Sequence, residues 1–275
     1  MRIATFNVNS LRMRMGILTD WLADAQPDVV CLQELKLTED KFPADALREA
    51  GYEHQIVWGQ KTYNGVAMLS KRPIEDPHTG FRLGPADKQA RLVQGTVDGV
   101  RIYGCYAPNG TKLATDKFAY KLTWYARLMR ELSLGGAGPS DPIVVCGDMN
   151  IAHGDNDVFS AAESHGKLHF HPVEREVFTQ LLNWGLVDTF RARNKGEKSF
   201  TWWDYRQDAF NRGIGLRIDY MLATKAVDER VTAVKHWRDL RALEKPSDHA
   251  PVTIDLANLD GTAELLGLRE VPEGS

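Results

Sequence analysis

Cysteine is scarce in this sequence, and the few cysteines present form no pattern. Cys31, Cys105 and Cys146 each lie in an apolar segment typical of a strand, and no two of them have C-x-x-C spacing. This argues against a disulfide framework and against a cysteine-based zinc site. We interpret the three as small buried hydrophobic side chains of a protein in a reducing compartment, and we expect that compartment to be the cytoplasm.

Long apolar runs and linkers are also missing. The N-terminus enters strand-like alternation at once, without the apolar core of a signal peptide, and no run approaches the roughly 18 apolar residues of a membrane span. The nearest candidate for a linker, S-L-G-G-A-G-P-S-D-P at 133–142, is only long enough to join a helix to the next strand. We therefore predict one domain over residues 1–256 and a C-terminal tail over 257–275 to which we assign no role.

The sequence also has no excess of basic residues over acidic ones. The 34 lysines and arginines are outnumbered by 37 aspartates and glutamates, which gives a formal net charge of −3. This argues mildly against a nucleic-acid partner, since such proteins usually carry a basic balance. Net charge does not exclude that partner, however, because acidic residues can be gathered in a metal site while basic residues lie on one face.

What is present is the composition of an ordinary globular protein, with 43% hydrophobic and 26% charged residues. Helical periodicity predicts helices at 12–25, 43–50, 116–132 and 173–184. Apolar or alternating segments predict strands at 2–8, 28–32, 52–58, 65–70, 91–97, 100–106, 143–146, 200–203, 217–223, 231–237 and 251–256. Because strands open and close the chain with helices between, we expect two sheets packed face to face and covered by helices.

The segment I-V-V-C-G-D-M-N at 143–150 is the centre of this arrangement. Its apolar half predicts a buried strand, and Gly147 would then allow the backbone to turn. Asp148 and Asn150 are two residues apart, so their side chains would point the same way from the end of the strand. An ordinary turn is the alternative interpretation, since Gly-Asp-x-Asn is also turn chemistry.

Polar residues end several other predicted strands. They are Asn7, Glu34, Tyr106 with Asn109, Asp219, and Asp248 with His249. Asp219 is the most informative, because it interrupts the apolar segment R-I-D-Y-M-L-A-T and a buried carboxylate needs a partner. A histidine would satisfy it, and the carboxylate would in turn fix the tautomer of the imidazole.

The types of these residues narrow the chemistry. Carboxylate and amide oxygens without cysteine suit a hard ion such as Mg²⁺ or Mn²⁺. There is no Walker-type glycine-rich loop, and no serine or cysteine stands in a nucleophile-elbow context. An aspartate-oriented histidine, a second aspartate and one hard metal are sufficient to activate water, so the residues favour direct hydrolysis of a phosphoester.

A set of motifs in the same order resembles the exonuclease III family of DNA-repair nucleases and apurinic/apyrimidinic (AP) endonucleases, within the endonuclease/exonuclease/phosphatase superfamily. The motifs are T-F-N-V-N-S-L-R (5–12), L-Q-E-L-K (32–36), N-G-V-A-M-L-S-K (64–71), Y-G-C-Y-A-P-N-G (103–110), G-D-M-N-I-A (147–152), T-W-W-D-Y-R (201–206), G-L-R-I-D-Y-M-L (215–222) and S-D-H-A-P-V (247–252). The resemblance covers residues 1 to about 256. It implies an α/β fold, a four-layered α/β sandwich of two packed mixed β-sheets flanked by helices.

The resemblance also implies roles for individual residues. The implied metal site, for Mg²⁺ or Mn²⁺, comprises Asn7, Glu34, Asp148, Asn150 and Asp248. The implied catalytic residues are Tyr106, Asp148, Asn150, Asp219 and His249. Asp148 would position or deprotonate the attacking water, or protonate the leaving oxygen, and His249, oriented by Asp219, would assist the nucleophile. The identity of the general base and the number of metal ions stay open.

The DNA-facing residues implied by the resemblance lie beside these carboxylates. Arg12, Lys36, Asn109, Lys112 and Arg217 would contact phosphates, and Trp202 and Leu216 would line the pocket for a baseless sugar. His169 stands where the family pattern has a small serine, so its bulk favours work at 3′ termini over cleavage at internal AP sites. For Trp203 and Tyr205 we expect core positions.

The leading hypothesis is a metal-dependent DNA-repair nuclease that combines 3′→5′ exonuclease, 3′-phosphatase or 3′-phosphodiesterase, and AP-endonuclease activity in unknown proportion. We expect a monomer that acts on duplex DNA with nicks, 3′ ends or abasic sites and does not bind membranes. One alternative is a phosphatase of the same superfamily acting on inositol phosphates or lipids. Another is a catalytically inactive DNA-binding module.

Overall fold

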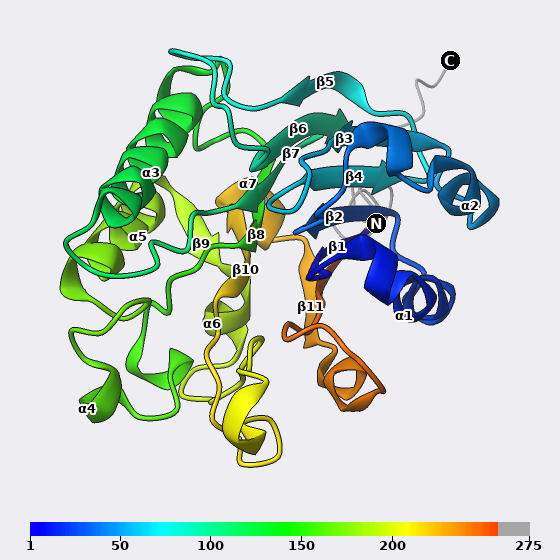
Figure 1. Cartoon of the computed structure of the whole chain (residues 1–275). Coiled ribbons are helices and arrows are strands. Elements are labelled where there is room, and N and C mark those ends of the chain that lie inside the picture. Colours follow the sequence, from blue (N-terminus) through cyan, green and yellow to red (C-terminus); the bar gives the residue numbers. More distant parts are fainter. Residues whose placement is uncertain (258–275) are drawn as a thin grey trace, which may run out of the picture.

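The computed structural model describes residues 1–257, and its strands form two six-stranded sheets (Figure 1). Sheet A has the order β11 (Val231–His236), β12 (Val252–Leu256), β1 (Arg2–Asn7), β2 (Val29–Gln33), β4 (Val66–Ser70) and β3 (His54–Trp58). Sheet B has the order β5 (Glu75–Thr79), β6 (Leu92–Val97), β7 (Val100–Tyr106), β8 (Ile143–Asp148), β10 (Asp219–Thr224) and β9 (Leu186–Asp188). The predicted tail, apart from residue 257, lies outside the described residues.

Both sheets are mixed. In sheet A the strands β1 and β2 are parallel, and in sheet B the strands β7 and β8 are parallel, whereas the remaining neighbours in each sheet are antiparallel. Each parallel pair is joined through a helix, since parallel strands need a long crossover. The two pairs lie near the middle of their sheets and carry their carboxyl ends to the same edge.

Helices cover the outer faces of the sheets. On sheet A lie α1 (Leu11–Ala25) and α2 (Ala44–Glu49), and on sheet B lie α3 (Asp116–Leu134) and α5 (Pro172–Trp184), as Figure 1 shows. The shorter helices are α4 (Ala161–Ser164), α6 (Thr189–Arg193) and α7 (Lys225–Asp228), with 3₁₀ turns η1 (Glu39–Lys41), η2 (Asp155–Asp157), η3 (Arg206–Asp208) and η4 (Arg238–Ala242). The order helix, sheet, sheet, helix confirms the predicted four-layered sandwich.

Three hydrophobic clusters hold these layers together. One lies between the sheets and includes Val29, Met68, Val93 and Val144. The second packs α3 and α5 onto sheet B, and the third packs α1 onto sheet A. Each large apolar side chain that is fully buried contributes about 1.5–3 kcal/mol to stability, so these clusters are the main force that fixes the strand ends in place.

The helices follow local signals in the sequence. In α3, Thr115 is the N-cap, and its hydroxyl accepts a hydrogen bond from the backbone N–H of Phe118 at 3.4 Å. Asp116 in the first turn complements the helix dipole. In α5, Pro172 starts the helix and Gly185 follows its end with a φ of 128°.

Two strands were not predicted, and one prediction was wrong. The strand β5 has the sequence E-D-P-H-T, which carries no apolar alternation, and it pairs with β6 at the edge of sheet B. The strand β9 has only three residues. Residues 200–203, predicted as a strand, form isolated bridges from Trp202 to Leu216 and to His249 and no ladder.

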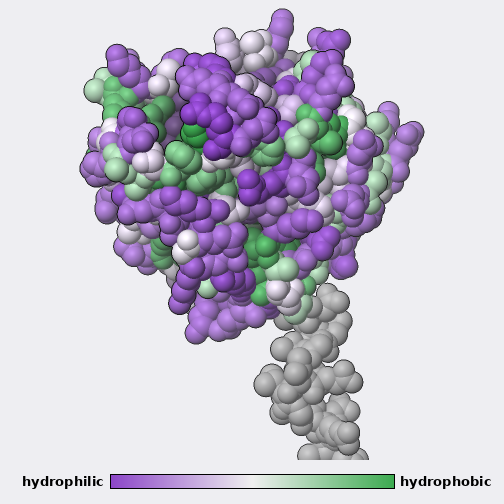
Figure 2. Space-filling model, turned by 90° about the horizontal axis from the view of Figure 1, so that it is seen from below, coloured by the Kyte–Doolittle hydropathy of each residue, from purple (hydrophilic) through white to green (hydrophobic). Residues whose placement is uncertain are grey.

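Figure 2 shows one face that is largely hydrophilic, with hydrophobic side chains in separate small areas. Among the helices of residues 1–257, none combines the length and the apolar character that crossing a membrane requires.

Candidate active site

The polar residues at the strand ends come together where the two sheets meet. Asn7 ends β1 and Glu34 follows β2, while Tyr106 and Asp148 end the parallel pair β7 and β8. Asp219 begins β10 and lies opposite Asp148 in the antiparallel ladder. The topology therefore gathers side chains that are far apart in the sequence at one edge of the sandwich.

Gly147 explains how β7 and β8 can approach at this point. Its φ is 137°, and a Cβ added to it would lie 1.9 Å from the carbonyl oxygen of Cys105. The sequence suggested a turn after the strand, but Gly147 lies within β8, which runs on to Asp148. Glycine is required here for a close backbone contact, and any side chain would push β8 away from β7.

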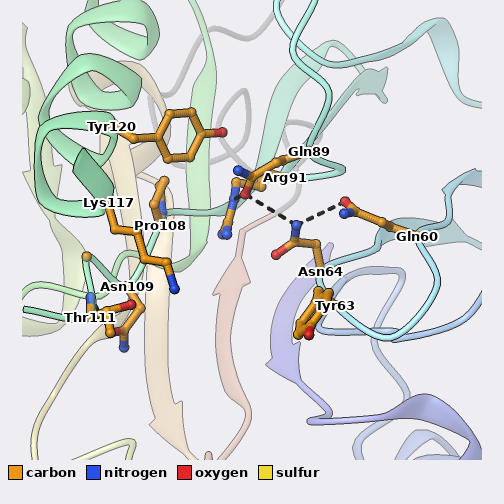
Figure 3. A pocket seen from close by; sticks show the side chains of 11 residues that line it. Gln60, Tyr63, Asn64, Gln89, Arg91, Pro108, Asn109, Thr111, Lys117 and Tyr120 are labelled. Atoms are coloured by element: carbon orange, nitrogen blue, oxygen red, sulfur yellow. Dashed lines mark hydrogen bonds between the residues drawn. The ribbon is translucent and has the colours of Figure 1, made fainter. Parts of the chain in front are cut away.

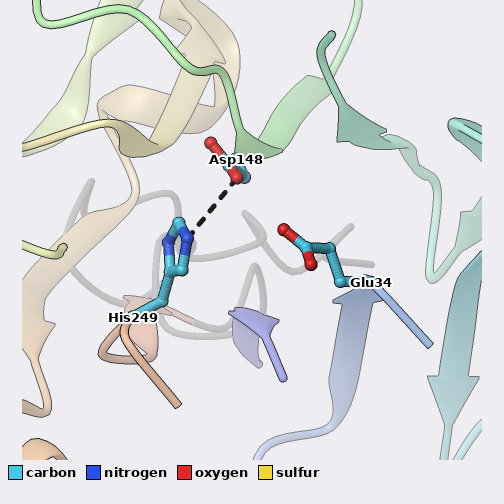
Figure 4. Close-up of side chains that lie close together, drawn as sticks. All are labelled: Glu34, Asp148 and His249. Carbon is cyan, nitrogen blue, oxygen red and sulfur yellow. Dashed lines mark ion pairs between the residues drawn. The ribbon is translucent and has the colours of Figure 1, made fainter. Parts of the chain in front are cut away.

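A cluster of three titratable groups forms the centre of the site. Glu34, Asp148 and His249 each offer a ligating atom, and these atoms lie within 4.8 Å of one another (Figure 4). The amide Nδ2 of Asn7 donates to Oε1 of Glu34 at 3.0 Å and to Oδ2 of Asp148 at 2.9 Å. The hydroxyl of Tyr106 donates to Oε1 of Glu34 at 2.8 Å. These donors orient the two carboxylates toward a common space.

His249 lies between two aspartates. Its Nδ1 is 2.9 Å from Oδ2 of Asp219, and its Nε2 is 3.7 Å from Oδ2 of Asp148. Burial by itself would lower the pKa of His249, but the two carboxylates outweigh burial and raise that pKa to about 10. The imidazole is therefore a cation at neutral pH in this environment.

In Asp148, burial acts on the pKa in the opposite direction, because it disfavours the negatively charged carboxylate. Burial, together with the nearby charges of Asp219 and Glu34, raises the pKa of Asp148 to about 7, although His249 opposes this shift. Its Oδ1 accepts the backbone N–H of Asn150 at 2.9 Å. A carboxyl group with a pKa close to neutrality can exchange a proton with a bound molecule, which is the property that general acid–base catalysis requires.

Glu34 stays ionised. Burial pushes its pKa upward, but the ammonium of Lys36 and the hydrogen bonds from Lys36 and Asn7 lower the pKa below its ordinary value. Nζ of Lys36 lies 2.8 Å from Oε2 of Glu34 and donates to Oδ1 of Asn9 at 2.5 Å. Lys36 therefore neutralises part of the negative charge at the site.

A second group of contacts surrounds Asn150. Its side-chain oxygen accepts from Nδ2 of Asn109 at 3.2 Å, and its side-chain nitrogen donates to the carbonyl of Ala107 at 2.9 Å. Nδ1 of His169 donates to the carbonyl of Asn150 at 2.7 Å. Burial and the nearby charge of Lys121 lower the pKa of His169 to about 3, so its ring is neutral.

Asp248 lies outside the central cluster. Its Oδ1 accepts from Nδ2 of Asn9 at 2.8 Å, and its Oδ2 accepts from Nε1 of Trp202 at 2.9 Å. Both oxygens are therefore engaged with neighbouring side chains. Within residues 1–257, the titratable groups close enough to share a metal are Glu34, Asp148 and His249. Because the imidazole of His249 is a cation, the two carboxylates are the donors that could hold a metal.

The backbone at the site is strained. Glu34 has a φ of 56°, Lys36 of 55°, Asn150 of 51° and His169 of 69°, all in the left-handed region that favours glycine. Such conformations cost about 1–3 kcal/mol each and persist only where the surrounding structure holds them. The site is thus maintained by its neighbours at some cost in stability.

Three cavities surround these groups. Trp202 and Leu216 line one of about 480 Å³. Arg12 and Lys36 line another of about 660 Å³. Figure 3 shows the third, of about 340 Å³, with Asn109 among the residues in its wall. Of the residues expected to face DNA, Lys112 lies exposed on the loop that follows β7.

The structure corrects the expectation for Arg217. Its side chain is 1% exposed, and its guanidinium donates to Oδ1 of Asp157 at 2.8 Å and to Oδ2 of Asp188 at 2.6 Å. A phosphate cannot reach this group, so the predicted contact with DNA is wrong. The arginine holds η2 to the end of β9, because two buried carboxylates need its charge.

The two aromatic residues expected in the core differ in their exposure to solvent. Trp203 is fully buried, as predicted. Tyr205 is 49% exposed, so its predicted core position is wrong. The hydroxyl of Tyr205 donates to the carbonyl of Pro246 at 2.9 Å and accepts from Arg14 at 2.9 Å. The polar end of the ring therefore joins two loops beside the site.

Two residues near the site were not predicted from the sequence. The guanidinium of Arg91 lies 4.7 Å from the centre of the Tyr106 ring. Nothing in its sequence context marks this position. Lys121 is fully buried in α3, on the same side of the helix as Phe118 and Tyr125. A lysine inside the apolar stripe of an amphipathic helix is a signal that could have been used.

Comparison with known proteins identifies the family to which this chain belongs. The profile of the endonuclease/exonuclease/phosphatase family matches residues 4–249. The chain belongs to this family. Within the family it is similar to exodeoxyribonuclease III of Haemophilus influenzae, with 36% identity over 264 residues that cover 92% of this chain and 98% of that protein.

The chain is also similar to solved structures of this family. The 3′ phosphatase NExo from Neisseria, bound to a product DNA hairpin, is 42% identical, and the match covers 94% of this chain and 100% of that one with a TM-score of 0.89. An AP endonuclease from Archaeoglobus fulgidus is 36% identical with the same coverages and the same TM-score. The predicted exonuclease III and AP endonuclease branch of the family is thereby confirmed.

Proposed function

We propose that this family member is a metal-dependent DNA-repair nuclease that hydrolyses phosphodiesters of duplex DNA at nicks, 3′ ends and abasic sites. The observation that carries the proposal is the cluster of Glu34, Asp148 and His249, backed by Asp219. It combines a metal-binding carboxylate, a group that can exchange protons and a cation. Relatives named as exodeoxyribonuclease III, 3′ phosphatase and AP endonuclease support the choice of DNA.

The residues present fit a hard divalent cation. Glu34 and Asp148 offer carboxylate oxygens in one space, the donor type that Mg²⁺ and Mn²⁺ prefer. Burial raises the pKa of Asp148, and the negative charges of Asp219 and Glu34 raise it further, so a bound cation would stabilise its ionised form. When bound, Mg²⁺ or Mn²⁺ would polarise a phosphoryl oxygen and stabilise charge on the leaving oxygen. We propose that Glu34 is the principal ligand.

We assign phosphate binding and proton transfer to the other side chains of the site. His249, held as a cation by Asp219, would donate a hydrogen bond from Nε2 to a phosphate oxygen. Asp148 would hold or move the proton, either from the attacking water or to the leaving oxygen. Asn150 and Tyr106 would contact the phosphate from the sides of the cluster. The buried, pre-oriented groups need little rearrangement to do so.

A basic surface beside the cluster would receive the DNA backbone. Arg12 and Lys36 line one cavity, Asn109 lines another, and Lys112 is exposed nearby. We propose that these residues contact phosphates, while Trp202 and Leu216 line the space for a sugar or a terminal nucleotide.

His169 supports a preference for 3′ termini. Its neutral ring is fixed to the carbonyl of Asn150, and its Nε2 lies 3.4 Å from Nδ2 of Asn109. The imidazole therefore fills space beside the two asparagines that are proposed to hold phosphate. We propose that this bulk disfavours DNA that continues past a flipped abasic sugar, whereas a terminal phosphate can still enter.

The deciding experiment compares substrates with the wild-type protein in Mg²⁺. A duplex with a 3′-phosphate at a nick, a duplex with an internal AP-site analogue, and an inositol polyphosphate are assayed at equal concentration. We expect fast release at the nick, slower internal cleavage and no turnover of the inositol compound. Preferred hydrolysis of the inositol compound would contradict the proposal, and so would tight DNA binding without any turnover.

A further inference from the structure

A fully buried ion pair lies behind the active site, and the proposed mechanism does not use it. Lys121 in α3 and Glu174 in the first turn of α5 are both 0% exposed. Lysine and glutamate are almost never buried completely unless they are paired, because both charges lose their hydration. The pair must therefore be stabilised by the groups that surround it.

Every donor of the Lys121 ammonium is used. It donates to Oε1 of Glu174, to the carbonyl of Asn150 at 2.7 Å and to the carbonyl of Asn109 at 3.2 Å. An ammonium has three N–H groups, so these contacts account for all of them. Two of the three acceptors are the main chain of the asparagines that are proposed to hold the scissile phosphate.

The pair also reaches a third segment. The carbonyl of Asn150 accepts Nδ1 of His169 as well as Lys121, so both of its lone pairs are engaged. Oε2 of Glu174 accepts the backbone N–H of His171 at 3.2 Å. One buried ion pair thus joins the loop after β7, the loop after β8 and the segment that leads into α5.

The strain at Asn150 indicates why such a connection is needed. This residue has a φ of 51° and its side chain must reach the neighbouring Asn109 at 3.2 Å. The charge-assisted bond from Lys121 to its carbonyl fixes the peptide in that conformation. Without that bond the loop could relax, and the amide of Asn150 would leave the position where a phosphate is expected.

We propose that Lys121 and Glu174 are positioning residues that fix the backbone of Asn109 and Asn150 for phosphate binding in the transition state. This inference rests on the proposed function. Stability alone does not require the pair, since buried ion pairs can be replaced by apolar groups of similar size with little loss. Misplacement of a phosphate-holding group by about 1 Å can cost up to about 10²-fold in rate.

The test uses the double variant Lys121→Met with Glu174→Gln, which removes both charges and leaves no unpaired ion. We expect kcat on a 3′-phosphate nick to fall by about 10- to 100-fold, while KM for the duplex and the Mg²⁺ concentration for half-maximal rate change less than about twofold. The matched control is Glu131→Gln. Glu131 is a buried acid of the same helix that accepts the backbone N–H groups of Arg82 and Leu83, away from the site. It should lower stability without lowering kcat.

A second background separates positioning from general damage. If Lys121 acts through Asn150, the double variant should lose less than about threefold when it is made in an Asn150→Ala protein. Wild-type kcat in the double variant would overturn the inference, and so would the full loss in both backgrounds. Urea denaturation and circular dichroism report folding, and should the double variant unfold, Glu174→Gln alone is measured in the same two backgrounds. A wild type inactive on all DNA would instead overturn the proposed function.

Discussion

Asp148 and Asp219 lie directly opposite each other in the antiparallel ladder of β8 and β10, and His249 contacts both. The register of one strand pair therefore places two carboxylates on either side of a single imidazole. A slip of one residue would turn one carboxylate to the other face of the sheet and leave the imidazole with one partner. The proton-handling group is in this sense a product of strand pairing.

The first prediction concerns this group. His249→Ala and Asp219→Asn should each lower turnover by on the order of 10²- to 10⁴-fold, the range for acid–base groups. A variant carrying both changes should be little worse than His249→Ala, because Asp219 acts through the imidazole. The measurement is kcat on a nicked duplex at saturating Mg²⁺. Losses that multiply fully would refute the pairing.

The second prediction concerns the metal. EDTA should abolish turnover, and Mg²⁺ or Mn²⁺ should restore it. Glu34→Ala should raise the Mg²⁺ concentration for half-maximal rate, because it removes an ionised carboxylate from the cluster. Glu53→Ala, at an exposed position, is the control and should titrate like wild type. An unchanged titration for Glu34→Ala would exclude Glu34 as a ligand.

The third prediction is that DNA binding depends strongly on salt despite the net charge of −3. A local basic surface meets the phosphates and releases counterions. Lys112→Ala should flatten the slope of log affinity against log salt by roughly one, the value for one lost phosphate contact. Lys225→Ala serves as the matched control, since its exposed side chain pairs with Glu229. If both variants keep the wild-type slope, the DNA surface does not include Lys112.

The fourth prediction follows from the corrected role of Arg217. Arg217→Met should lower the free energy of unfolding by about 3–5 kcal/mol, because it removes the buried cation that Asp157 and Asp188 share and leaves Arg191 as the partner of Asp157. The salt slope of DNA binding should stay at the wild-type value. Urea denaturation and a binding titration measure the two effects. A change confined to the salt slope would restore the phosphate contact expected from the sequence.

The fifth prediction concerns His169. His169→Ser should raise the rate at an internal AP analogue relative to the rate at a 3′-phosphate nick, since it removes the ring beside Asn150. Because the pKa of His169 is about 3, the ring stays neutral above pH 5 and the ratio for wild type should not change through its titration between pH 5.5 and 8. An unmoved ratio in the serine variant would show that His169 is not a gate.

The sequence was most informative where chemistry constrains a residue strongly. Asp219 interrupts an apolar strand, so a partner had to exist, and the structure supplies His249. The ends of the parallel pairs could be placed together because strand direction alone brings them to one edge. The four-layered architecture followed from the order of strands and helices, and the motif resemblance agrees with it.

Other features depend on contacts that no local pattern encodes. Arg217 and Lys36 have similar motif contexts, yet one is 1% exposed and the other lines an open cavity, because the guanidinium of Arg217 faces Asp157 and Asp188. The strand β5 was missed because its pairing with β6 is set by position at the edge and not by hydrophobic alternation.

The arrangement of strands has a consequence for biosynthesis. Sheet B is assembled from strands between Glu75 and Thr224, whereas β1, which precedes all of these strands in the sequence, lies in sheet A between β2 and β12. At about 5–20 residues per second, a ribosome needs on the order of ten seconds or more after making β1 to deliver β12. During that time one edge of β1 has no partner, and sheet B can form first. The nascent chain therefore carries an open strand edge until β12 has been made, and a transient partner such as a chaperone has its greatest effect in that interval.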